Sequence, residues 1–118
     1  MNPEELLTRY QAGERDFRQV DLTEADLSGL DLNGIDFSGA NLSQANLSGT
    51  NLSRATLSSA ILKNANLTGA NLSEADLSWA DLGFANLTRA NLTGATMTAT
   101  ILFRVRFKDT IMPDGQER

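Results

Sequence analysis

The sequence predicts an all-β solenoid, a stack of coils in which short extended segments alternate with corners. The first observation is a strict period of five, because every fifth residue from Phe17 to Phe107 is Leu, Phe or Met. The second is that the residue two positions before each of these centres is usually small or aliphatic, and most often Ala. Period five fits neither a helix, which repeats near 3.6 residues, nor a continuous strand, which repeats at 2. Each unit therefore combines a corner with an extended piece whose two apolar positions point inward.

The unit is clearest between Gly39 and Ala60, where the chain reads GANLSQANLSGTNLSRATLSSA. The residue before each centre is usually Asp or Asn, and the residue after it is usually Ser or Thr. This A-[D/N]-L-x-x pattern runs through residues 15–109 and resembles the pentapeptide repeat family. The resemblance implies a right-handed quadrilateral β-helix of about five coils, stacked at roughly 4.8 Å, in which residues twenty apart share a side. Many members of that family, including the abundant cyanobacterial ones, have no assigned biochemical role.

Residues 1–14 are predicted to form a short helical cap over the first coil. Asn2 suits the N-cap, Pro3 the first helical position and Glu5 a capping box. Gly13 suits the helix stop. The apolar residues expected to face the first coil are Leu6, Leu7 and Tyr10. We expect this cap because the open ends of a solenoid promote aggregation.

The other end is predicted to lack a helix. The β-helix is assigned to residues 15–109 and a C-terminal tail to residues 110–118. Thr110, Ile111 and Met112 would give a degenerate twentieth repeat, and Pro113 and Gly115 would then interrupt the pattern. Either this tail or a second subunit is expected to cover the last coil.

The composition excludes several classes of function. The chain has no Cys and no His, so the commonest metal ligands and general base are missing, and no cofactor, metal or catalytic site is expected. The net charge of −5 argues against direct nucleic-acid binding. The N-terminus resembles no signal peptide and no apolar run would span a membrane, so we expect a cytoplasmic protein without a membrane partner. The Ser and Thr after each centre are expected to hydrogen-bond the corner backbone.

One side of the predicted coil carries large apolar residues at positions that elsewhere are polar or small. We interpret them as a contact surface, because contiguous exposed apolar groups tend to mark interfaces. Its occupant would be a partner protein, a second copy of the chain or the C-terminal tail. The residues are Ile61, Trp79, Phe84, Ile101 and Phe103.

The predicted function is that of a non-catalytic protein–protein interaction or scaffold module with an unknown protein partner. A homodimer through the apolar residues or the C-terminal end is a second arrangement to test. The alternative implied by the family resemblance is an acidic DNA mimic that inhibits or protects DNA gyrase. Residues 15–109 hold eight basic and ten acidic residues, a net charge of only −2 (8 − 10), and the acids crowd the first coils. The interaction module is therefore ranked first.

Overall fold

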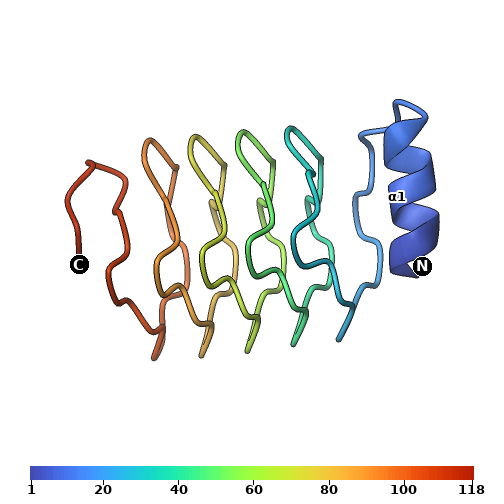
Figure 1. The fold of residues 1–118 in the computed structure, drawn as a ribbon. Coiled ribbons are helices and arrows are strands. Elements are labelled where there is room, and N and C mark those ends of the chain that lie inside the picture. The colour runs from blue at the N-terminus through green and yellow to red at the C-terminus, as the bar shows by residue number, and fades with distance from the viewer.

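The computed structural model describes all 118 residues as a rod of 36 × 23 × 21 Å. The middle of the rod is a stack of similar coils, with the helix α1 (Pro3–Gln11) packed over the N-terminal end and a bent segment closing part of the C-terminal end (Figure 1). The solenoid predicted from the five-residue period is confirmed. No helix is long and apolar enough to cross a membrane.

Residues twenty apart pair in parallel, which places four five-residue sides in each coil. No strand is longer than one bridging residue. Side one carries bridges between Asp16, Asp36, Thr56, Asp76 and Thr96; side two between Asp21, Asn41, Ile61, Asp81 and Ile101; side three between Asp26, Asn46, Asn66, Asn86 and Arg106; side four between Asp31, Asn51, Asn71, Asn91 and Ile111. Backbone hydrogen bonds connect neighbouring coils, as from Leu42 N–H to the Ile61 carbonyl at 2.7 Å. The predicted stacking register is thus present.

Every corner contains left-handed backbone. The residue two positions after each centre has a φ between 52° and 73°, whether it is Gly34, Arg54 or Trp79. In most corners the N–H of the next residue donates to the carbonyl of the centre, as from Ala25 to Leu22 at 3.0 Å. A positive φ at the third residue of such a four-residue turn is typical of type II. The corners therefore take this conformation even where they do not have glycine.

The residue before the centre holds each corner with its side chain. In most repeats the Asp or Asn Oδ1 accepts a hydrogen bond from the N–H two residues on, as in Asn41 and Ser43 at 3.0 Å. The Ser or Thr hydroxyl often donates to that same oxygen, as from Thr23 to Asp21 at 2.7 Å. The prediction that these hydroxyls bond the corner backbone was wrong, because the Asx oxygen takes both the backbone and the hydroxyl donor.

The axis of the rod is filled by side chains. The centres from Leu22 to Leu92 are at most 1% exposed, and Ala occupies most of the neighbouring inward positions. Thr50 and Thr110 are buried among them, and their hydroxyls donate to the carbonyls of Leu27 and Leu87 at 2.7 Å. No buried side-chain nitrogen or oxygen lacks a partner. The interior is a satisfied core and not a ligand pocket.

The helix α1 covers the first coil as predicted from its capping residues. Asn2 Oδ1 accepts from the Glu5 N–H at 2.8 Å, and Gly13 follows the helix with a φ of 101°. Leu6 is fully buried, and the Tyr10 hydroxyl donates to the Asn33 carbonyl at 2.6 Å. Leu7, which was expected to face the coil, is only half-buried and lies outside the core cluster.

The coil pattern continues past residue 109. Ile111 bridges Asn91 in parallel on side four, so residues 110–112 form the degenerate twentieth repeat. The chain then turns at Gly115 and returns, and Glu117 pairs with Ile111 in the antiparallel sense. Met112 N–H donates to the Gln116 carbonyl at 2.7 Å in this short hairpin. The tail therefore pairs with side four of the last coil.

We predict that the core is densely packed in the middle of the rod and less so at the C-terminal edge. Leu62→Ala should lower the free energy of unfolding by about 2–5 kcal/mol, because it opens a cavity in a fully buried position. Leu102→Ala changes the same position of the repeat where the side chain is 38% exposed, and should cost less than half as much. Urea denaturation measures both, and equal losses would contradict the packing described.

Candidate functional site

The five apolar residues predicted from the sequence lie on side two and its adjoining corners. We call them the side-two patch: Ile61, Trp79, Phe84, Ile101 and Phe103. Their exposed fractions range from 37% for Ile61 to 68% for Trp79, whereas the Leu centres beneath them are buried. The patch is therefore a surface feature laid over an intact core.

The structure brings some of these residues into contact and separates others. The rings of Phe84 and Phe103 meet edge to face with centroids 5.5 Å apart. Gly83 lies one coil below Phe103, and because it is glycine no side chain at that position obstructs the Phe103 ring. Ile61 and Ile101 stand on the same ladder with Asp81 between them. The patch is thus an aromatic pair with flanking apolar groups, interrupted by one carboxylate.

Several residues of the side-two patch occupy positions that, in other repeats, hold residue types that stabilise the corner. Ile61 and Ile101 occupy the position of the Asx acceptor, and no side chain accepts from the N–H of Lys63 or Phe103. Trp79 and Phe84 hold φ values of 64° and 61°. Bulky side chains are disfavoured in this left-handed region. These four residues thus depart from the residue types that suit the repeat, which favours a role at the surface.

The sequence did not reveal how exposed the last coil is. Leu102 occupies a centre position but is 38% exposed, and Met97 and Phe107 are only partly buried. These three residues complete the pattern in the sequence, but no coil lies above them. The signal that could have found them is their position within one coil of the end of the repeats.

Acidic residues gather at the opposite end of the rod. All four sides of the first coil present Asp: Asp16, Asp21, Asp26 and Asp31. Only Asp16 and Asp36 stack directly, and Arg18 offsets this pair by bonding Asp16 at 2.8 and 2.9 Å. The hydrogen bonds from Arg18 lower the pKa of Asp16 to about 2. Elsewhere each bridged Asp has only neutral neighbours on its ladder, which limits repulsion between coils.

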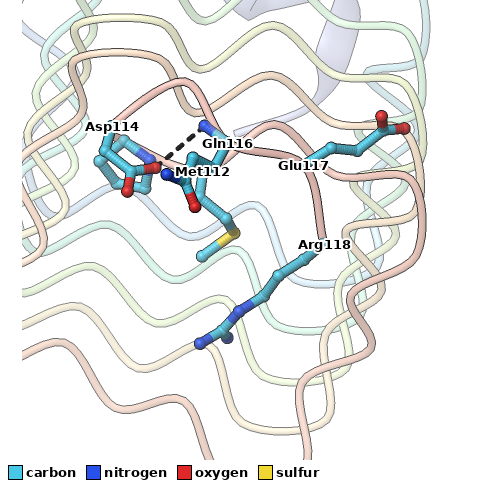
Figure 2. A pocket seen from close by; sticks show the side chains of 6 residues that line it. Met112, Asp114, Gln116, Glu117 and Arg118 are labelled. Atoms are coloured by element: carbon cyan, nitrogen blue, oxygen red, sulfur yellow. Dashed lines mark hydrogen bonds between the residues drawn. The ribbon is translucent and has the colours of Figure 1, made fainter.

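The one pocket of the structure lies on the C-terminal hairpin. It encloses about 440 Å³ and is lined by Met112, Pro113, Asp114, Gln116, Glu117 and Arg118. Figure 2 shows that the Asp114 carboxylate faces Gln116, whose N–H donates to it at 3.0 Å. The hollow contains no nucleophile paired with a base. No group of three ligating residues in the chain could hold a metal ion.

The axis of the rod is filled, its coils are four-sided, and in most repeats an Asx side chain holds the corner. These features define a β-helical repeat protein in which the outer faces are the surface available for contact. The chain belongs to the pentapeptide repeat family. The family model describes pentapeptide repeats and matches eight copies over residues 16–39, 35–73 and 70–109. No functionally curated protein matches the sequence.

Solved structures agree with this assignment. The pentapeptide repeat protein Rfr23 from the cyanobacterium Cyanothece 51142 is 45% identical with a TM-score of 0.77, and the match covers 78% of this chain and 63% of that one. The pentapeptide repeat protein alr5209 from Nostoc PCC 7120 is 37% identical with a TM-score of 0.80, and the match covers 89% of this chain and 94% of that one. The chain thus spans less than two thirds of Rfr23 but nearly all of alr5209.

A third structure shares the fold alone. HetL, a pentapeptide repeat protein involved in heterocyst differentiation regulation in Nostoc PCC 7120, is 24% identical with a TM-score of 0.54. The match covers the whole of both chains.

We predict that the isoleucines of the side-two patch cost the rod stability. Ile101→Asn should raise the free energy of unfolding by about 0.5–1.5 kcal/mol, because the amide oxygen would accept from the Phe103 N–H. Asn41→Ile on the same ladder is the reverse control and should lower it by a similar amount, since Asn41 now accepts from Ser43. Thermal and urea unfolding measure both. A loss of stability in both variants would contradict this account.

We predict that the pKa of Asp16 depends on Arg18. Because the pKa is lowered in the folded state, the carboxylate stabilises the fold above pH 3.8 and this contribution disappears as the pH falls through about 2. Arg18→Ala should move the pKa of Asp16 back toward 3.8, as followed by carboxyl ¹³C NMR. The pKa of Asp21 is lowered by hydrogen bonds from Thr23 and should not change, which provides the internal control. An unaltered Asp16 titration in the variant would refute the role of Arg18.

Proposed function

We propose that this protein is a non-catalytic interaction module that binds a partner protein through the side-two patch. The observation that carries the proposal is that four of the five patch residues occupy positions where they weaken the local fold. Ile61 and Ile101 replace the Asx acceptor, and Trp79 and Phe84 occupy left-handed corners. Backbone strain and surplus exposed apolar area tend to persist where a contact compensates for them.

The composition of the patch supports a protein as the occupant. Trp and Phe are enriched at the cores of protein interfaces, where their large area is removed from water. Trp79 is 68% exposed and Phe103 is 60% exposed, so most of their surface is available for a contact. Lys63 and Arg104 lie beside the patch and Asp81 lies within it, which gives polar groups for orientation.

The chemistry of the chain argues for binding and not for catalysis. The axis is filled, the one hollow lacks a nucleophile–base pair, and the sequence has neither His nor Cys. The rigid faces of the rod are the surface on which specific recognition would take place.

The distribution of charge argues against a DNA mimic that binds gyrase. Such a mimic needs acidic groups along most of the rod, in the manner of the two phosphate strands of a duplex. Here no acidic residue occurs from Phe37 to Ser73, while Arg54 and Lys63 fall in that stretch. The middle coils therefore present a neutral to basic surface.

We predict that Trp79 is needed for binding and not for folding. Trp79→Gly removes the large side chain and relieves the positive φ, so the free energy of unfolding should be unchanged or higher. Arg89→Gly is the matched control, because Arg89 holds the same repeat position with a φ of 59° on another corner. Quantitative affinity capture from cells that carry the protein should recover one stoichiometric partner with the native chain and Arg89→Gly, but not with Trp79→Gly.

Light scattering of the purified chain shows whether the partner is a second copy of the chain or a different protein. A monomer that gains a partner in the capture experiment supports the proposal. A native dimer that becomes monomeric in Trp79→Gly would assign the patch to self-association instead. Equal capture by both glycine variants would refute the placement of the site.

A further inference from the structure

The C-terminal end of the rod has backbone donors without acceptors. In the coil below, Leu82 N–H donates to the Ile101 carbonyl and Phe84 N–H donates to the Phe103 carbonyl, both at 2.9 Å. Leu102 and Arg104 hold the same positions one coil higher, and no group accepts from their N–H. Met97 and Ala99 on side one are equally unpaired. Sides one and two of the last coil are therefore open strand edges.

The chain itself shows how such an edge is occupied. On side four, Thr110 N–H donates to the Arg118 carbonyl at 3.1 Å, and Arg118 N–H returns a bond to Thr110 at 2.8 Å. Residues 116–118 thus add an extended antiparallel segment to the last coil (Figure 1). Arg118 also lies over the Phe107 ring at 5.3 Å. The tail covers side four and reaches side three, and it leaves sides one and two uncovered.

The open edge is basic. Residues 97–108 contain Arg104, Arg106 and Lys108 and no acidic residue. None of the three forms an ion pair, since the two ion pairs of the rod are Arg9–Glu14 and Arg18–Asp16. Leu102, two residues before Arg104 on side two, is 38% exposed. An extended segment that pairs here would place one apolar side chain over Leu102 and acidic side chains beside the arginines.

We propose that side two of this edge, residues 101–104, binds an extended acidic segment of another protein, added as a short antiparallel strand. Main-chain pairing at a free sheet edge supplies affinity, and side chains at alternate positions supply specificity. This inference goes beyond the interaction through the side-two patch, because it rests on backbone donors and cations at the end of the rod. A second copy docked edge to edge about a two-fold axis would bring the basic edges of both copies together, which costs free energy.

The probe is a blocked octapeptide of alternating glutamate and valine, and its control is the same peptide with lysine in place of glutamate. In ¹⁵N-labelled native chain, the glutamate peptide should slow hydrogen exchange of the Leu102 and Arg104 amides by roughly tenfold or more, because they become hydrogen-bonded. The Leu42 amide, which is already paired, should not change. The lysine peptide should give no protection, and added salt should weaken the effect of the glutamate peptide.

Two variants separate this edge from the side-two patch. Arg104→Glu should abolish protection by the glutamate peptide, while Arg89→Glu, at the same repeat position one coil below the open edge, should leave it intact. Trp79→Gly should also leave it intact, so failure of the patch and failure of the edge are distinguishable. Equal protection by both peptides, or no protection at saturating glutamate peptide, would overturn the proposal. Protection of the edge amides without peptide in a dimeric sample would overturn it as well.

Discussion

The backbone pairing between residues twenty apart is the constraint on which the rest of the structure depends. Each side contributes only one bridging residue and a few hydrogen bonds, so no coil is a stable sheet by itself. Stacking makes these bonds continuous along the rod, and it places Leu above Leu in the axis. A residue such as Leu62 is buried because the coils above and below are in register. The core and the ladders are therefore two consequences of one spacing.

This register divides the side chains into those that build the rod and those that are free to vary. Asn41 and Thr23 hold the corners, and Leu and Ala fill the axis. Corner residues make few such contacts, so these positions accept Gly, Arg or Trp on the same left-handed backbone. The residues of the side-two patch therefore add exposed apolar surface at a local energetic cost that the stack as a whole absorbs.

Much of the fold could be predicted because the same requirement, an apolar residue that points inward at every fifth position, recurs throughout the repeats. The five-residue period correctly predicted that Ile61 and Ile101 share one ladder, and the capping residues correctly predicted the helix α1. The predicted role of the Ser and Thr hydroxyls was wrong. Within a corner the Asx oxygen and the backbone carbonyls compete for the hydroxyl donor, and the Asx oxygen accepts it. The pairing of Ile111 with Glu117 and the exposure of Leu102 depend on which neighbour lies above the last coil. A repeating pattern carries no information about its own end.

The four-sided register also constrains how such a chain can evolve. Inserting twenty residues adds a full coil and leaves every later residue on its original side. Inserting five keeps the core pattern intact but rotates everything downstream by a quarter turn. If the insertion falls between Ile61 and Ile101, Ile101 leaves the side that it shares with Ile61, and the apolar surface is split between adjacent faces. Genetic changes that appear equally harmless to the core thus differ in whether they preserve the geometry of the outer faces.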